Sequence, residues 1–417
     1  FKTLFIKIEK SDIADCNPTW ESQGPLVRKI KWTPVGCPKG VKMSTIKIMA
    51  LGGVRENGKN LYVAEVNEHI FVLDAGAKYP ENEQLGVDIV VPNFEYLEEN
   101  KHRVAGIFLS HGHADAIGAL PYLLEKVKVP VFGSHLTIEL VKLLVKNNNA
   151  TKKFNDFHVI NEKTEIDFGD SVVSFFQTTH SIPESLGVVI KTDQGNIVYT
   201  GDFKFDQAAD KFYKTDFSRL AEIGNEGVLA LLSDSANADS NEQGASMHEA
   251  REEILNTIAD WDGRIIVAAV ASNIVRIQQI FDAAEKTGRR IVLTGHDVEN
   301  IVRTAIQLKK LHLVSEKLLV KPKDIAKYED HELIILETGR MGEPLNGLRK
   351  MAICRHRYVE IKDGDLVYIV TTPSISKEAV VARVENLVYK AGGVVQSIAK
   401  KLRVSGHGSS RDLQLMM

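Results

Sequence analysis

Cysteine is scarce in this chain, and charge of either sign is nearly balanced. The 417 residues contain three cysteines, Cys16, Cys37 and Cys354, which lie far apart. An odd, widely spaced set argues against a disulfide framework and predicts a reduced, cytoplasmic setting. The formal net charge is only −3. The average charge therefore does not indicate a strongly basic nucleic-acid binder, and any contact with phosphates must depend on a local patch.

Long apolar runs are also absent. The longest, such as 265–271, fall far short of the roughly 20 residues that a membrane-spanning helix needs, so we expect no membrane partner. No fixed-period repeat or low-complexity tract occurs, which disfavours solenoids and disordered tails. The remaining composition is ordinary, with 44% hydrophobic residues, and the length predicts two domains with large buried cores.

An irregular N-terminal segment is followed by two regions that differ in their pattern of predicted strands and helices. Residues 1–42 show no sustained period, and we treat them as an extension of unknown role. Residues 43–209 alternate short β-type runs with turn signals, which predicts sheet packed on sheet with flanking helices. Residues 210–375 alternate helical blocks with isolated strands, which predicts βαβ units and a parallel sheet. Residues 376–417 are expected to return to the first domain.

Individual elements can be placed by their periodicity. In the first domain we expect a helix at 117–127 and strands at 46–51, 60–66, 70–74, 103–109, 159–160, 165–168, 172–179, 187–192 and 196–200. In the second domain we expect helices at 248–260 and 274–287 and strands at 228–233, 264–270 and 290–293.

The most informative segment reads Ser-His-Gly-His-Ala-Asp-Ala-Ile-Gly, from Ser110 to Gly118. His111 and His113, two apart on a turn, can direct neutral imidazoles at one ion, while Asp115 projects from the same loop. A packing core has no reason to produce this spacing. Ala116 stands where a two-metal hydrolase of this pattern would carry a third histidine, and its methyl group cannot bind a metal.

Three further candidates follow other predicted strands. His180 closes the strand 172–179, and Asp202 comes just after 196–200. A carboxylate such as Asp202 can bridge two cations that acidify a water for attack on a phosphodiester. Asp74, at the end of 70–74, would orient a histidine from outside the ligand shell. Zinc and manganese suit this set of imidazoles and carboxylates equally well.

Several motifs together resemble the ribonuclease J family, in which a metallo-β-lactamase domain carries an inserted β-CASP domain. The resemblance extends from about residue 47 to residue 417. Its motifs are His111-Gly-His-Ala-Asp115, His180, Thr200-Gly-Asp-Phe-Lys-Phe205, Ser233-Asp-Ser-Ala-Asn-Ala-Asp239, Gly58-Lys-Asn60, Leu85-Gly-Val-Asp88, Ala271-Ser-Asn273, Gly342-Glu-Pro344 and Ser405-Gly-His-Gly408. The resemblance implies an α/β fold: an αββα metallo-β-lactamase sandwich with an inserted α/β β-CASP domain. It also implies removal of nucleotides from 5′-monophosphorylated ends of single-stranded RNA, with endonuclease cleavage, during rRNA and mRNA maturation and decay.

The resemblance also implies roles for individual residues. His111, His113 and His180 would bind one metal, Asp202 would bridge to a second, and Asp115 would serve that second metal.

The β-CASP motifs carry the remaining roles. Asp234 and His407 would be the pair that transfers protons during catalysis. The segment implied to hold the substrate phosphate is Arg403, Val404, Ser405, Gly406 and His407.

Three departures from the family pattern concern the site. Ala116 replaces a ligand of the second metal, Arg403 stands where the family usually has histidine, and Arg340-Met341 replaces Ser-Gln before Gly342. They imply a degenerate second site with weak activity, resembling a second, weaker paralogue of certain Gram-positive bacteria that pairs with an active sister. A further family ligand, on a Pro-Val-His segment, is expected beyond Met417, together with a small C-terminal domain on which oligomerisation could depend.

Two hypotheses from different classes remain open. The chain is either a weak, metal-dependent RNA nuclease or a non-catalytic RNA-binding subunit, as a homo-oligomer or in a complex with an active homologue. RNA turnover by the purified chain, and the effect of Ala116→His, distinguish them. A small-molecule hydrolase is disfavoured, because the inserted domain and the glycine turn would have no task. The cations at 349–357 fit either RNA contact or an ordinary solvated helix face.

Overall fold

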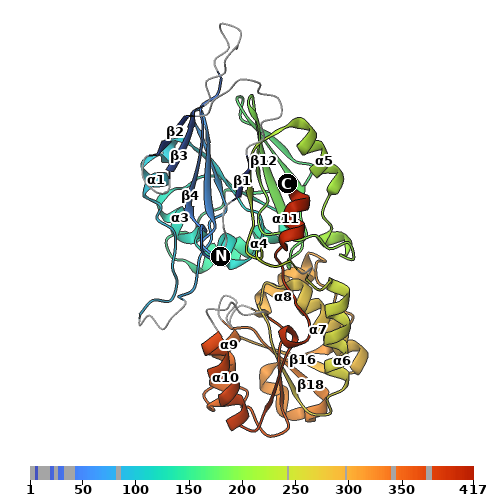
Figure 1. The fold of residues 1–417 in the computed structure, drawn as a ribbon. Helices are drawn as coiled ribbons and strands as arrows, with labels where there is room; N and C mark the ends of the chain where they lie inside the picture. Colours follow the sequence, from blue (N-terminus) through green and yellow to red (C-terminus); the bar gives the residue numbers. More distant parts are fainter. Residues whose placement is uncertain are drawn as a thin grey trace.

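Two domains make up the chain in the computed structural model (Figure 1). The structure describes residues 5–7, 19–22, 27–31, 43–80, 86–241, 244–295, 298–339, 344–371 and 378–417. The first domain holds two sheets and the second holds one parallel sheet. Cys354 is exposed and unpaired, and the other two cysteines lie outside the described residues.

The first sheet has the order β2-β3-β4-β5-β6-β7-β8-β9. Its strands are β2 (Thr19–Ser22), β3 (Val27–Lys31), β4 (Ile46–Gly52), β5 (Leu61–Val66), β6 (His69–Leu73), β7 (Val104–Phe108), β8 (Val131–Gly133) and β9 (Phe157–Val159). It is antiparallel from β2 to β6 and parallel from β6 to β9.

The second sheet has the order β1-β14-β13-β12-β11-β10. Its strands are β1 (Phe5–Lys7), β10 (Glu165–Asp167), β11 (Val172–Gln177), β12 (Leu186–Thr192), β13 (Gly195–Tyr199) and β14 (Val228–Ser233). The first domain's helices are α1 (Glu95–Glu99), α2 (Ala114–Ile117), α3 (Leu120–Lys126), α4 (His135–Asn147), α5 (Phe217–Glu226) and α11 (Ser410–Met416), with 3-10 turns η1 (Lys101–Arg103) and η2 (Lys211–Tyr213).

Alternation along the strands separates the layers of this domain. Phe71 of β6 faces inward, where it packs with Phe175 of the opposite sheet in a core between the two sheets. Val72, the next residue, faces outward into the cluster that contains Leu123 of α3. On the far side, Val189 of β12 packs in the cluster with Ile223 of α5. Period-two burial thus produces the four layers of an αββα sandwich, which confirms the predicted fold class.

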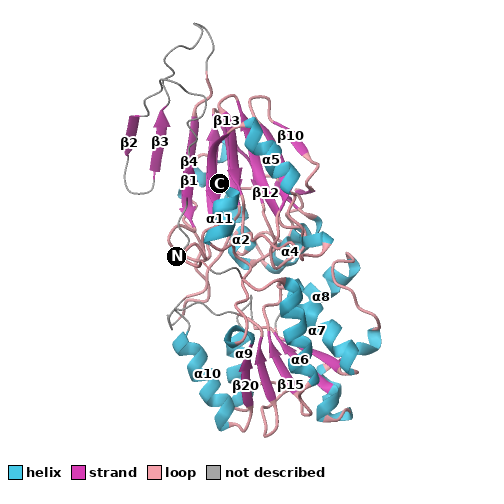
Figure 2. Ribbon diagram, turned by 45° about the vertical axis from the view of Figure 1, so that its right-hand side comes forward, coloured by secondary structure: helices cyan, strands magenta, loops and turns pink. Residues whose placement is uncertain are grey.

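The second domain has three layers (Figure 2). Its parallel sheet has the order β17-β16-β18-β15-β19-β20. The strands are β15 (Ile265–Ala268), β16 (Arg290–Thr294), β17 (Leu319–Val320), β18 (Leu333–Glu337), β19 (Leu366–Ile369) and β20 (Val394–Ser397). The helices are α6 (Met247–Ala259), α7 (Ile274–Thr287), α8 (Val298–Gln307), α9 (Pro344–Ala352) and α10 (Glu378–Lys390), with 3-10 turns η3 (Glu316–Leu318), η4 (Pro322–Lys327), η5 (Asp330–Glu332) and η7 (Ile398–Lys400).

The chain passes from the first domain to the second, and back again, at later residues than the sequence pattern predicts. Residues 228–233, assigned there to the second domain, form β14, which pairs in parallel with β13 of the first domain. Residues 376–417 were expected to return at once, but β20 pairs with β19 of the second sheet. The chain is back beside the first domain by Ser409, which forms a bridge with Asn237, and then forms α11.

Three strands lie within the predicted extension of residues 1–42. The backbone of β3 pairs with β4, and that of β1 pairs with β14. No helix in the described ranges combines the length and the apolar character needed to cross a membrane.

A buried ion pair joins two strands of the second domain at their starts. Arg264 donates from Nε and Nη2 to the two oxygens of Asp365, at 3.0 and 2.7 Å. We expect Asp365→Ala to lower the free energy of unfolding by about 3 to 5 kcal/mol, because the arginine charge stays buried without its partner. Glu299→Ala, which breaks the exposed pair with Arg303, should cost less than about 0.5 kcal/mol. Urea unfolding followed by circular dichroism measures both; equal losses would contradict the argument.

Candidate metal centre

The candidate site residues gather where strands of both sheets of the first domain end. His111 follows β7, His180 follows β11, Asp202 follows β13 and Asp234 follows β14. Asp74, the residue after β6, lies beside β7 because β6 and β7 are parallel neighbours. Polar side chains are concentrated here because these residues lie on loops that follow the strands and do not pack into the sandwich core.

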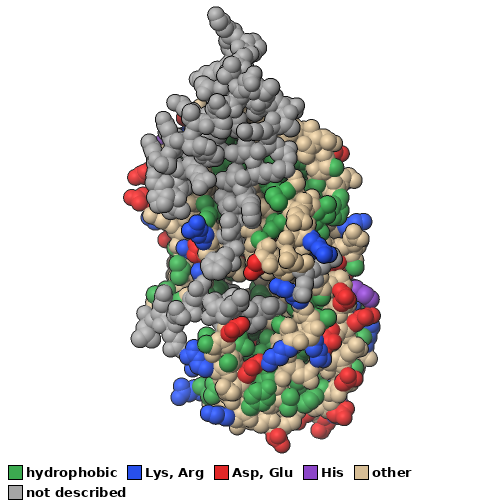
Figure 3. Space-filling view, in the orientation of Figure 1, with side chains coloured by type: hydrophobic (Ala, Val, Ile, Leu, Met, Phe, Trp, Pro, Cys, Tyr) green, Lys and Arg blue, Asp and Glu red, His purple; other side chains and the backbone are tan. Residues whose placement is uncertain are grey.

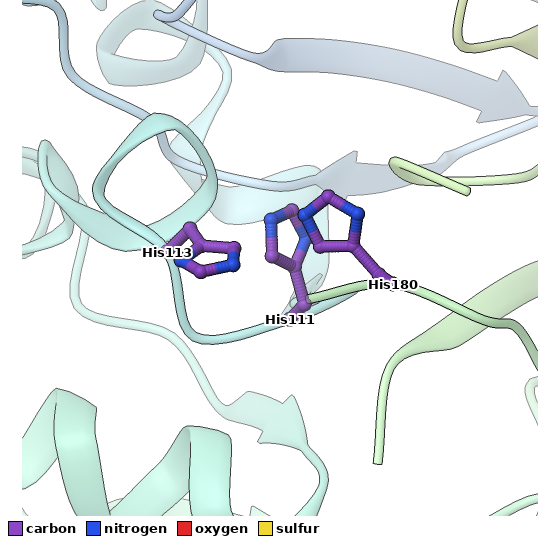
Figure 4. A group of neighbouring side chains, drawn as sticks. All are labelled: His111, His113 and His180. Atoms are coloured by element: carbon purple, nitrogen blue, oxygen red, sulfur yellow. The ribbon is translucent and has the colours of Figure 1, made fainter. Parts of the chain in front are cut away.

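Three histidines form the centre of this site (Figure 4). The ring centroids of His111, His113 and His180 lie 4.8 to 5.0 Å apart. One nitrogen from each ring lies within 4.8 Å of the nitrogens of the other two. His111 and His180 are 1% and 4% exposed. Three converging, largely desolvated imidazoles are the ligand set of a zinc-like ion.

The protonation states suit metal binding. Burial, and after it the charge of the neighbouring His111, lower the pKa of His180 to about 3. Burial and the other histidines also hold the pKa of His113 well below its usual value. Both imidazoles are therefore neutral near pH 7, which is the form that binds a metal. Burial also acts to lower the pKa of His111, but the carboxylates around it outweigh this, and the net shift is upward.

A relay of hydrogen bonds holds His111 from behind. Asp74 accepts hydrogen bonds from the Ser110 backbone N–H at 2.7 Å, the Ser110 hydroxyl at 2.7 Å and the Tyr199 hydroxyl at 2.6 Å. Because the Ser110 hydroxyl donates to Asp74, its oxygen accepts from Nδ1–H of His111, 2.9 Å away. Asp74 thus reaches a histidine through Ser110. Burial raises its pKa to about 6.

The same relay leaves Nε2 of His111 facing the site. That nitrogen is buried and has no hydrogen-bond partner in the described part of the chain. A buried polar atom without a partner is costly, and a metal ion would remove the cost. The residues present therefore fit a bound metal.

His180 is oriented in a comparable way from the end of the second domain. Its Nδ1–H donates to the carbonyl oxygen of Gly406 at 2.8 Å. A carbonyl only accepts, so the proton sits on Nδ1 and the lone pair of Nε2 remains for the ion.

His113 is held by two serine hydroxyls. Its Nδ1 lies 2.6 Å from Ser272 Oγ, and its Nε2 lies 2.8 Å from Ser181 Oγ. Ser272 comes from the loop before α7, so this bond joins the histidine cluster to the second domain. Neither serine was predicted as a site residue. Ser272 belongs to the motif Ala271-Ser-Asn273, and Ser181 directly follows a predicted ligand, which are the only signals the sequence offers.

A second possible ligand set overlaps the first at His111, and a third, formed by Asp202, Asp234 and His407, overlaps the second at Asp202. His111, Asp115 and Asp202 offer ligand atoms within 4.8 Å of one another. Asp115 Oδ1 lies 3.4 Å from Nε2 of His111, the nitrogen that also faces the histidine cluster. The histidine set and the set with Asp115 therefore both need Nε2 of His111. Ala116, within α2, is fully buried in the apolar cluster behind the site and supplies no ligand atom.

Asp234 and His407 form a pair beside the histidines. Nδ1 of His407 lies 2.7 Å from Asp234 Oδ2 and 3.8 Å from Asp202 Oδ2. Asp234 also accepts a hydrogen bond from the backbone N–H of Ala236 at 2.9 Å. The rings of His407 and His180 are 5.6 Å apart. A partly exposed histidine fixed by a buried carboxylate can exchange protons with a group bound at the cluster.

The residues of the segment 403–407 differ in their exposure and in their contacts. Arg403 is exposed, whereas Val404 is buried in the apolar core. The Ser405 hydroxyl accepts from Asn237 Nδ2 at 2.7 Å and from the His407 backbone N–H at 3.0 Å. Gly406 lies against the His180 ring. Val404 and Ser405 therefore shape the turn, and Arg403 is the exposed cation of this segment.

A methyl group at residue 406 is expected to weaken metal binding. A Cβ there would lie 2.8 Å from Cε1 and 3.1 Å from Nδ1 of His180. We expect Gly406→Ala to displace that ring and lower metal affinity about 10- to 100-fold. Gly224→Ala is the matched control, because nothing lies within 4 Å of a Cβ there. Competition with a chelating dye measures both proteins; equal affinities would contradict the proposed role of His180.

The cations at 349–357 lie on and after α9. Arg349, Lys350, Arg355 and Arg357 are exposed, and Arg357 packs over the Tyr358 ring at 5.0 Å. Basic and acidic side chains are interspersed on the face of this domain shown in Figure 3. The departures at Arg340 and Met341 lie outside the described residues.

Comparisons with known proteins agree with this architecture. The chain matches the model of the metallo-β-lactamase superfamily over residues 54–243 and that of the ribonuclease J β-CASP domain over residues 262–388. A crystal structure of a protein of unknown function from Enterococcus faecalis V583 has a similar fold. Its TM-score is 0.64 at 14% identity, covering 89% of this chain and 91% of that one. The chain is thus a metallo-β-lactamase protein with a β-CASP domain.

Sequence relatives define the family. The chain is 70% identical to Ribonuclease J 2 of Streptococcus pyogenes serotype M3 over 375 residues, which are 90% of this chain and 68% of the relative. It is 43% identical to Ribonuclease J2 of Bacillus subtilis over 372 residues, 89% of this chain and 67% of that protein. The chain belongs to the ribonuclease J family, as the motifs predicted.

Proposed function

We propose that this chain is a metal-dependent RNA nuclease of the ribonuclease J type. It would remove nucleotides from 5′-monophosphorylated single-stranded RNA and cut RNA internally, in rRNA and mRNA maturation and decay. The observation that carries the proposal is the histidine cluster next to the Asp234–His407 pair, at the junction with a β-CASP domain. The relatives' name, Ribonuclease J 2, supports the choice of RNA.

The proposed roles follow from the positions of the side chains. His111, His113 and His180 would hold zinc or manganese, which supplies Lewis acidity toward the phosphodiester and its attacking water. Asp202 lies beside both this cluster and His407, so it would complete the ligand set. His407, fixed by Asp234, would hold or deliver the proton of the group that attacks or leaves. The exposed Arg403 would attract the substrate phosphate.

We further propose that one metal ion is bound and that activity is weak. The first two ligand sets need His111, the third set is assigned here to proton transfer, and Ala116 offers no replacement ligand. A two-metal mechanism stabilises the attacking and the leaving oxygens with separate ions. With one ion, part of that stabilisation is lost, and the rate should fall by orders of magnitude.

A catalytically inactive, RNA-binding subunit is the second candidate function. Ala116 favours it, because its buried methyl group stands at a position where the family pattern has a ligand. In this case the chain would act in a homo-oligomer, or in a hetero-oligomer with an active ribonuclease J paralogue, and its cluster would serve structure more than turnover.

The deciding experiment measures 5′-end degradation of a 5′-monophosphorylated single-stranded RNA by the purified protein with zinc or manganese. Asp202→Ala is the control for contaminating nucleases, because it removes a carboxylate shared by the proposed ligand and proton-transfer groups. Turnover that this variant lacks establishes the nuclease. Equal turnover in both proteins, with RNA or a paralogue still bound, establishes the inactive subunit.

A further inference from the structure

A cavity of about 580 Å³ lies between the two domains, apart from the metal centre. One side is the first-domain segment 210–213, which includes η2. The other side is formed by α6, α7 and the turn 309–312 after α8. Cavities of roughly 300–1,000 Å³ at domain junctions are common binding sites for small molecules.

The charges of the lining favour an anion. Lys211, Lys309, Lys310 and Arg251 face the cavity together with only two carboxylates, Asp210 and Asp282.

Both lining carboxylates lie close to the same cation, Arg251. Arg251 lies 3.2 Å from Asp210 and 3.6 Å from Asp282. Lys310 pairs with Glu184 at 2.7 Å, outside the lining. Lys211 and Lys309 form no ion pair with any residue in the described ranges, and both are exposed. Counting Glu184 with the two lining carboxylates, the four cations exceed the carboxylates by one charge, and the excess lies with the two lysines that form no ion pair within the described part of the chain.

The ring of Phe212 holds two of the lysine ammonium groups in place. The ammonium group of Lys310 lies 4.2 Å from the ring centroid, and that of Lys211 lies 4.9 Å from it. Contacts of this kind hold ammonium groups by attraction to the ring's π electrons. Phe212 is itself tied down, because its carbonyl oxygen accepts from the Glu184 backbone N–H at 3.2 Å. The cations are thus presented from a supported wall.

The side of the cavity that contains Phe212 is connected to the metal centre. The Ser181 carbonyl accepts from the backbone N–H of Val275, a cavity residue, at 3.3 Å, and the Ser181 hydroxyl contacts His113. One loop, residues 181–184, therefore borders the histidine cluster on one side and the cationic cavity on the other. An anion in the cavity would lie one loop away from the proposed site of RNA cleavage.

We propose that this cavity binds the phosphate of a nucleotide. The choice of a nucleotide rests on the proposed function, since RNA and its mononucleotides are the anions that a nuclease site meets. The cavity itself requires only an anion of that size. Two sources share this chemistry: a free nucleoside 5′-monophosphate, and one nucleotide of an RNA strand that extends from the metal centre.

The test measures binding without turnover. Full-length protein in EDTA is titrated with uridine 5′-monophosphate by calorimetry, and with a fluorescein-labelled ten-nucleotide RNA by anisotropy. The double variant Lys211→Glu/Lys309→Glu reverses one charge on each side of the cavity. The matched control, Lys163→Glu/Lys286→Glu, reverses one exposed charge in each domain away from it. Thermal unfolding verifies that both variants are folded.

The cavity variant is expected to weaken binding about tenfold or more, while the control stays within about twofold. Loss of mononucleotide binding identifies the free nucleotide as the ligand, and loss in the RNA arm alone identifies the strand. Equal losses in both variants, or no loss in the cavity variant, overturn the proposal. Asp202→Ala separates the two proposals: it should abolish cleavage yet leave the cavity binding unchanged.

Discussion

A His111→Ala protein is expected to bind its metal at least about a hundredfold more weakly than the unaltered chain. His111 belongs to both ligand sets that include the histidine motif, so its loss cannot be covered by a shift of the ion between those two sets. Loss of a residue that merely orients a ligand already costs about 10- to 100-fold. Removal of the ligand itself should therefore reach or exceed the upper end of that range.

The measurement is zinc content after dialysis against a chelator of fixed strength, with affinity from competition titration. His158→Ala is the matched control, because His158 is an exposed histidine of the same domain that pairs with Asp156. Undiminished zinc in the His111→Ala protein would refute the assignment. The unaltered chain should hold one ion, because the first two sets share His111 and the third is assigned to proton transfer; two ions per chain would refute that part.

The sequence predicted the elements around this site well because their periodicity is local. Short, nearly continuous apolar runs bounded by turn residues mark β5 and β6, and the helical spacing of 274–287 matches α7. Histidines placed directly after predicted strands were expected to lie on strand-end loops, and His111 and His180 do so. These inferences need only the neighbouring residues, so they do not depend on how the sheets associate.

Sheet membership could not be predicted in the same way. The strand at 228–233 has a helix before and after it, like the βαβ units that follow, yet it joins β13. Its partner is chosen by register and by packing against α5, which a local pattern does not contain. The same limit applies to β20, whose apolar residues fit either domain but pair with β19.

The side chains that hydrogen-bond to the histidines of the centre could not be predicted from local sequence patterns either. Ser272 reaches His113 from a residue 159 positions away, and a single serine carries no signal of such a contact. Ser110 was visible in the motif, but its place between Asp74 and His111 depends on the parallel pairing of β6 and β7. The cationic cavity likewise joins segments of two domains that are far apart in the sequence.

A His407→Ala protein is expected to retain its metal but to degrade 5′-monophosphorylated RNA about 10²- to 10⁴-fold more slowly than the unaltered chain, which is the usual contribution of a positioned acid or base. The ring of His407 is 22% exposed and is held by Asp234 at 2.7 Å, so it can meet a bound substrate. Its Nδ1 is 3.8 Å from Asp202, outside hydrogen-bond distance, so its removal should leave the metal ligands in place.

Asp234→Asn tests whether the pair works as one unit. Each single substitution should slow kcat strongly, and the double substitution should be little worse than either, because groups that act together are not additive. The matched control is His248→Ala, which removes an exposed histidine paired with Glu252 in α6. Independent, multiplying losses would show that His407 and Asp234 act separately. A loss of zinc in the His407→Ala protein would instead make His407 a metal ligand and remove it from proton transfer.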